Sequence, residues 1–81
     1  MELPLKYLTE PTTFERAAAE YEHDGRPFGD AEDDWRRLLA KCRDGDELWK
    51  FAPPSRDVFQ VWGVALVRSG RVVSTVITAV D

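Results

Sequence analysis

The sequence has one cysteine, one histidine and no long apolar segment, and each shortage excludes a class of protein. Cys42 has no second cysteine for an internal disulfide, and the start of the chain lacks the basic and apolar regions of a signal peptide. The longest run of apolar residues and glycine, Val61 to Val67, is far shorter than the roughly 18 residues that span a membrane. We therefore expect a cytoplasmic protein with one small domain, residues 1–81.

Basic residues are also scarce, with 11 lysines and arginines against 15 acidic residues and a formal net charge of -4. Direct binding to DNA or RNA is disfavoured, because nucleic-acid-binding domains are usually basic. The acidity is local, since residues 10–34 hold nine acidic residues and two arginines, a formal charge of -7. Because local charge steers partners, these acids are predicted to bind a protein with a basic surface. They are Glu10, Glu15, Glu20, Glu22, Asp24, Asp30, Glu32, Asp33 and Asp34.

Two segments, residues 13–23 and 31–43, have apolar side chains at intervals of three and four residues. This spacing predicts a helix with one buried face in each segment. Thr12 and Glu15 match the capping-box pattern, which predicts the start of the first helix. Asp30 is the expected N-cap of the second helix.

From residue 47 the apolar period changes to two, which is typical of strands. The predicted strands cover residues 47–51, 58–68 and 71–80, with a Ser-Gly loop joining the last two in a hairpin. Alternation over residues 3–8 leaves a fourth, edge strand open. The predicted fold class is α+β, with two helices packed on a mainly antiparallel sheet of three or four strands and the long final hairpin at its centre.

Both faces of this hairpin are apolar if its loop is symmetric, because Trp62 would then face Ile77 and Val64 would face Thr75. Two helices can cover only one face. The other would be covered by the N-terminal segment, a second copy of the chain or another protein. The predicted dimer surface on that face consists of Phe59, Val61, Val67, Val72 and Val76.

The sequence contains few side chains in a pattern suited to catalysis. Cys42 lies on the apolar stripe of its predicted helix, and His23 lies at a helix end, where the dipole accounts for it. Consecutive acids at 32–34 point in different directions on a helix and cannot converge on one metal ion. We therefore expect a protein that is not an enzyme, with no catalytic residue, cofactor or metal.

The segment Gly45-Asp46-Glu47-Leu48-Trp49-Lys50-Phe51 and the later segment from Gly63 to Val73 carry a resemblance to known sequences. They resemble a group of small uncharacterised bacterial proteins with the layout G-D-E-L-W-x-F followed by G-x-A-L-V-R-x-G-x-V-V. This resemblance covers the C-terminal half and implies an α+β domain without implying an activity. By size and acidity, the chain is also similar in type to phage anti-CRISPR inhibitors.

Two classes of function are compatible with these features. In the first, a non-enzymatic binding protein inhibits or regulates a basic, nucleic-acid-handling partner such as a CRISPR effector complex, because clustered carboxylates can occupy a groove built for phosphates. An immunity protein against a toxin uses the same electrostatics. In the second, a housekeeping domain self-associates through its spare sheet face, and its acids serve only solubility.

Overall fold

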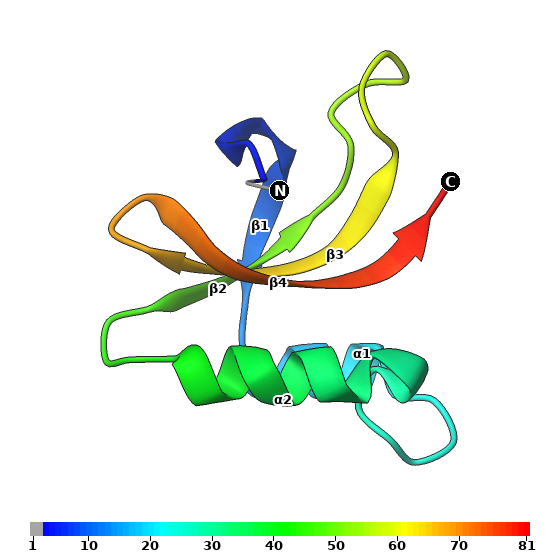
Figure 1. Cartoon of the computed structure of the whole chain (residues 1–81), viewed down its shortest axis with the longest axis vertical. Coiled ribbons are helices and arrows are strands. Elements are labelled where there is room, and N and C mark those ends of the chain that lie inside the picture. Colours follow the sequence, from blue (N-terminus) through cyan, green and yellow to red (C-terminus); the bar gives the residue numbers. More distant parts are fainter. Residues whose placement is uncertain (1–2) are drawn as a thin grey trace.

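Four strands form one antiparallel sheet, and both helices lie under the same face of it (Figure 1). The computed structural model describes residues 3–81, so residues 1 and 2 of the predicted domain lie outside the described residues. The α+β class is confirmed. The elements are β1 Leu8–Thr12, α1 Phe14–Glu20, α2 Glu32–Lys41, β2 Glu47–Phe51, β3 Val61–Arg68 and β4 Arg71–Val80, with 3-10 turns at Leu5–Tyr7 and Gly29–Ala31.

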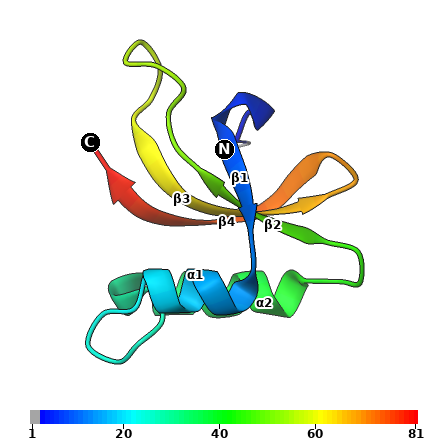
Figure 2. The same cartoon turned by 180° about the vertical axis from the view of Figure 1, so that it is seen from behind.

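The strands follow one another across the sheet in the order β1-β2-β3-β4. The two helices are inserted between β1 and β2, and α2 runs back alongside α1 (Figure 2). The prediction that the final hairpin lies at the centre of the sheet is wrong. Because β1 pairs with β2 and not with β4, β2 and β3 are the central strands and β4 is an edge strand.

The N-terminal strand lies further along the chain than its sequence pattern predicts. Residues Leu5–Tyr7 form a 3-10 turn, and β1 begins at Leu8. Pro11 lies within β1, which is an edge strand, the position in a sheet where a residue without a backbone N–H is tolerated. A one-residue irregularity between Leu8 and Glu10 also interrupts the pairing with β2.

Both helices are shorter than predicted and start differently. Thr12 belongs to β1, and the N-cap of α1 is Thr13, whose hydroxyl accepts a hydrogen bond of 3.1 Å from the Arg16 N–H. The N-cap is therefore displaced by one residue, and the predicted capping box does not form, because Arg16 rather than Glu15 lies three residues after the cap. Asp30 lies inside the 3-10 turn before α2 and caps nothing, and the N-cap position is taken by Ala31, without a side-chain hydrogen bond.

The final hairpin is confirmed, but its predicted register holds only beside the loop. Val67 faces Val72 as expected, and irregularities in β4 then shift the pairing, so that Val64 faces Val76 and Trp62 faces Ala79. A one-residue shift moves a side chain to the other face of a sheet. Val76 therefore lies on the face that the helices cover, whereas the sequence places it on the other.

The face of the sheet toward the helices carries the larger core. Its central members are Trp35 and Leu38 of α2, which pack on side chains from β2, β3 and β4. Trp35, Leu38 and Ala17 are at most 4% exposed, as the two apolar stripes require. The buried residues of this core are Ala17, Phe28, Trp35, Leu38, Leu48, Val64, Leu66 and Val76.

The opposite face, called the outer face below, is covered by the N-terminal segment of the same chain. Leu3 and Tyr7 pack on Phe51, Val61 and Ala65. The Tyr7 hydroxyl donates a 2.9 Å hydrogen bond to the backbone carbonyl of residue 59, which attaches the segment to the loop before β3. The sequence left three possibilities for what covers this face, and the structure shows that the N-terminal segment does so.

Candidate functional site

Charge is divided between the two ends of α2. Residues 21–34, which join α1 to α2 and form the first turn of α2, hold six carboxylates and one arginine, a formal charge of -5. Residues 35–43 hold four basic residues and no acidic one, a formal charge of +4. We call residues 21–34 the acidic end. The helix connection that forms most of it projects from the helical layer in Figure 2.

The local sequence folds this connection back on itself. The Tyr21 carbonyl accepts a 2.9 Å hydrogen bond from the Phe28 N–H, and the backbones of His23 and Arg26 bond to each other at 3.0 and 3.1 Å. The turn between them needs a left-handed backbone at Asp24, with a φ of 52°, which aspartate tolerates better than most residues. The two sides of the connection are therefore held together, and their acidic side chains share one end of the molecule.

A stack of aromatic rings attaches the acidic end to the core. The ring of Phe28 lies 5.1 Å from that of Tyr21 and 4.4 Å from that of Trp35, and Trp35 in turn contacts Phe14 with ring centroids 6.0 Å apart. Burial, followed by the charge of Glu20, raises the pKa of the Tyr21 hydroxyl. The acidic end is thus built on packed rings, and its exposed carboxylates extend from a supported backbone.

Two of the nine predicted acids are paired away from this end. Lys50 of β2 lies between them, with its Nζ 2.6 Å from Glu20 and 3.7 Å from Glu10. The hydrogen bond to Glu20 raises the pKa of Lys50. These carboxylates connect β1, β2 and α1, and Lys50 offsets one of their two negative charges within the chain.

Other acids pair along or beside α2. Glu32 contacts Arg26 at 3.4 Å and Arg36 at 3.6 Å, and Asp34 bonds Arg37 at 2.8 Å. Asp24 lies 3.5 Å from His23, a contact that is ionic only when the histidine is protonated.

Four of the predicted acids, namely Glu15, Glu22, Asp30 and Asp33, make no ion pair within residues 3–81. Glu15 lies in the first turn of α1, away from the others. Glu22, Asp30 and Asp33 belong to the acidic end, and all three are exposed. The predicted nine-residue set therefore reduces to a smaller group whose negative charge has no counter-ion in the described part of the chain.

A hollow of about 340 Å³ adjoins these carboxylates. Its lining comes from the helix connection and from the end of β4, and includes Tyr21, Phe28, Asp30, Ile77 and Thr78. Sequence reasoning missed it, because nothing in the local pattern indicates that the last residues of β4 meet the helix connection.

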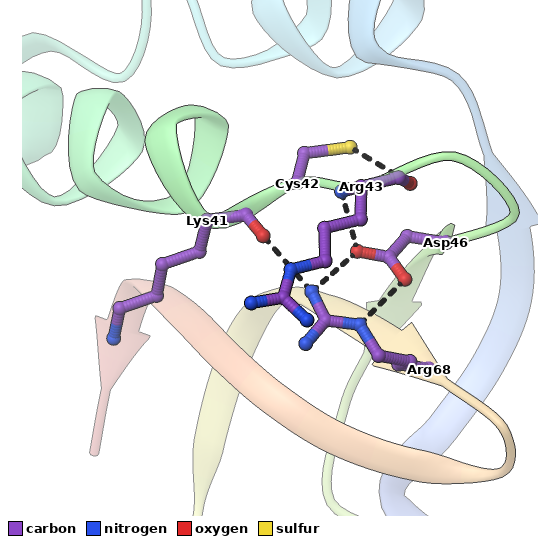
Figure 3. Close-up of polar contacts among 5 residues, drawn as sticks. All are labelled: Lys41, Cys42, Arg43, Asp46 and Arg68. Carbon is purple, nitrogen blue, oxygen red and sulfur yellow. Dashed lines mark hydrogen bonds and ion pairs between the residues drawn. The ribbon is translucent and has the colours of Figure 1, made fainter.

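Near the opposite end of α2, the carboxylate of Asp46 and the guanidinium of Arg68 form an ion pair (Figure 3). Arg68 bonds both oxygens of Asp46, through Nε at 2.9 Å and Nη2 at 2.8 Å, and Nη2 also donates to the Lys41 carbonyl at 2.9 Å. The Arg43 N–H donates to the same carboxylate at 2.8 Å. The Asp46 side chain is only 1% exposed. These hydrogen bonds, above all those from Arg68, lower the pKa of Asp46 from 3.8 to about 2.

Cys42 lies beside this pair and is half-buried, with its Sγ 3.8 Å from the Arg43 carbonyl. His23, the single histidine, belongs to the acidic end at the other end of α2, so it cannot serve as a base for this thiol. Within residues 3–81, no group of three histidine, cysteine or acidic side chains could hold a metal ion. In the same described residues, no helix is long and apolar enough to cross a membrane.

The predicted dimer residues are scattered in the structure. Val61, Val67 and Val76 are at most 4% exposed within this one chain, so they present no surface to a partner. Val72 is half-buried, and Phe59 is 51% exposed. These five residues do not form one surface because the hairpin register is shifted and because the N-terminal segment covers part of the outer face.

No family model matches this chain, and no curated protein or solved structure is significantly similar to it. The resemblance of its C-terminal half to small bacterial proteins, and its likeness in type to anti-CRISPR inhibitors, therefore stay predictions.

Proposed function

We propose that the protein is a non-enzymatic binding protein that docks through its acidic end on a basic, phosphate-binding surface of a larger protein. By occupying that surface it would keep nucleic acid away and so inhibit or regulate the partner. The observation that carries the proposal is the group Glu22, Asp30 and Asp33, whose exposed carboxylates have no ion pair within residues 3–81.

The physical basis is the difference between a paired and an unpaired carboxylate. A carboxylate that already bonds a lysine or arginine, as Glu20 does with Lys50, must break that contact before it can bind a partner. An unpaired carboxylate keeps its full charge, attracts a basic surface over about 8 Å at physiological salt and speeds encounter with it. The supported backbone of the acidic end also reduces the entropy lost on binding.

The experiment compares two triple variants that change the net charge equally. The test variant is Glu22→Gln with Asp30→Asn and Asp33→Asn. The control variant is Glu15→Gln with Glu47→Gln and Asp57→Asn, three exposed acids outside the acidic end. Each variant changes the formal net charge from -4 to -1.

Tagged forms of the protein are incubated with a nuclease-treated bacterial lysate at low salt, and bound proteins are eluted with rising salt and identified. We expect the wild type and the control variant to retain the same basic protein, and the test variant to lose it. Added nucleic acid should release that protein from the wild type. Retention by all three forms, or release that nucleic acid does not promote, would contradict the proposal.

An anti-CRISPR inhibitor and an immunity protein against a nuclease toxin are both special cases of this function. Both would use the same carboxylates, so they differ only in the partner that is recovered. A multi-subunit RNA-containing complex would indicate the first, and a single secreted toxin domain would indicate the second.

A further inference from the structure

The outer edge of β4 is open. Within residues 3–81, β4 pairs only with β3, so the other side of its ten residues, Arg71–Val80, has no strand beside it. Unpaired N–H and C=O groups along an edge strand are a template for another strand. The opposite edge of the sheet is protected, because β1 has only five residues and contains Pro11.

Apolar side chains accompany this open edge on the outer face of the sheet. In the pairing of β3 with β4, Ile77 lies opposite Gly63 and Val80 lies opposite Val61. The side chain of Val61 belongs to the core of the outer face. Residues that face each other in an antiparallel pair lie on the same face. Ile77 is 43% exposed and Val80 is 59% exposed, so the N-terminal cover stops before it reaches the edge.

We infer that a second copy of this chain pairs its own β4 antiparallel to this one, which forms a continuous eight-stranded sheet across a two-fold axis. The irregularities of β4 fall on either side of residues 74–77, and this regular stretch is where the two strands would bond. With the axis at Val76, Ile77 lies opposite the partner's Thr75, and Val80 lies opposite the partner's Val72.

Charge complementarity selects this occupant and this register. With Val76 on the axis, Arg71 lies opposite the partner's Asp81, and the symmetry repeats the contact at the other end. Arg71 and Asp81 are both exposed, and neither makes an ion pair within the described residues. Opposite charges across neighbouring strands stabilise a pair, whereas like charges destabilise it.

The helices beneath the edge are complementary in the same way. Asp34 and Lys41 are seven residues apart on one flank of α2, and Lys41 lines a hollow together with Val73 of β4, so this flank lies on the β4 side. The two-fold axis makes the two α2 helices antiparallel. The acidic start of each α2 would therefore lie beside the basic end of the other.

The test is a charge exchange read by sedimentation equilibrium over a range of protein concentrations. We expect the wild type to form a dimer, and Arg71→Glu or Asp81→Arg alone to raise its dissociation constant by about tenfold or more, because each creates two like-charge contacts. The double variant Arg71→Glu with Asp81→Arg restores opposite charges at both contacts and should restore the dimer. Arg56→Glu, an exposed site away from β4, is the matched control and should leave the dimer unchanged.

A wild type that stays monomeric at every concentration would overturn the inference. So would a dimer that both single variants leave intact, since another surface would then hold it. Circular dichroism of each variant shows that the fold is retained, and protection of β4 amides from hydrogen exchange only in the dimer locates the contact. Residues 56, 71 and 81, which these variants change, all lie outside the acidic end, so the variants test this inference separately from the proposed function.

Discussion

The two ends of α2 differ in how their charged side chains are paired. At its C-terminal end, Asp46 and Arg68 bond each other through two hydrogen bonds, and the carboxylate is enclosed. At the acidic end, Glu22, Asp30 and Asp33 are exposed and have no ion pair within residues 3–81. The first arrangement holds α2, β2 and β3 together. The second contributes little to the fold, and its charge is available to a partner.

The acidic residues near α2 also fall into two groups that a count of charges does not distinguish. Glu32 and Asp34 lie in the first turn of α2, where negative charge is stabilised by the helix dipole, and both have arginine partners. Asp33 shares this turn but has no ion-pair partner within the described residues, and Glu22 lies in the helix connection and gains neither benefit. A local excess of acidic residues is therefore a weaker indication of a binding site than the subset that the fold leaves unpaired.

The largest expected effect is on the sheet that supports both ends. A Cβ added at Gly63 would lie 2.0 Å from the Val76 carbonyl oxygen and 2.9 Å from the Phe51 ring. Gly63→Ala should therefore force β3 and β4 apart and lower the free energy of unfolding by about 3 kcal/mol. Urea denaturation measures the loss. Unchanged stability would show that β3 and β4 do not approach as closely as described.

The second expected effect distinguishes the ion pair near the C-terminal end of α2 from exposed charges elsewhere. Arg68→Ala removes both hydrogen bonds to Asp46 and leaves an enclosed carboxylate without its partner. The melting temperature should fall clearly, whereas Arg56→Ala, which removes an exposed arginine, should change it little. Equal melting temperatures for the two variants would remove the distinction between a structural and an available charge.

The third effect is a pH dependence confined to the same pair. The pKa of Asp46 is about 2 in the folded protein and ordinarily 3.8, so the unfolded chain takes up a proton first as the pH falls. The stability from this group is complete above pH 3.8 and is lost as the pH falls toward 2. Denaturation at pH 5 and pH 2 should show a smaller acid loss in Asp46→Asn than in the wild type. An equal loss in both proteins would contradict this assignment.

The smallest expected effect is on the acidic end itself. The triple variant Glu22→Gln, Asp30→Asn and Asp33→Asn changes exposed side chains without ion-pair partners in the described residues. Each change should alter the free energy of unfolding by no more than about 0.5 kcal/mol. Thermal denaturation checks this, and a large loss would mean that these carboxylates serve the fold.

Most of the fold could be predicted from the sequence because its elements have strong local patterns. The spacing that buries Trp35 and Leu38 predicts α2, and the Ser-Gly loop predicts the final hairpin. The irregular register of β4 could not be predicted, because it depends on contacts such as the close approach of Gly63 to Val76. Thr13 rather than Thr12 caps α1 because β1 extends through Thr12, which a local motif does not reveal.

The candidate site could be predicted only in outline. The sequence identifies the acidic stretch, since nine acids between residues 10 and 34 are visible by counting. It does not reveal that Lys50, thirty residues beyond Glu20, forms ion pairs with both Glu20 and Glu10. The pairing of β1 with β2 places Glu10 opposite Lys50, and the position of α1 brings Glu20 to the same lysine. Only these tertiary contacts identify the carboxylates that remain unpaired.

The most direct test of the central claim is a titration of the isolated partner with the two triple variants at physiological salt. The acidic-end variant should bind at least about tenfold more weakly than the control variant, a difference of about 1.4 kcal/mol, although both carry the same net charge. Equal weakening of the two variants would show that the partner responds only to net charge. Unchanged binding of the acidic-end variant would show that the partner contacts another surface, and either result would contradict the account.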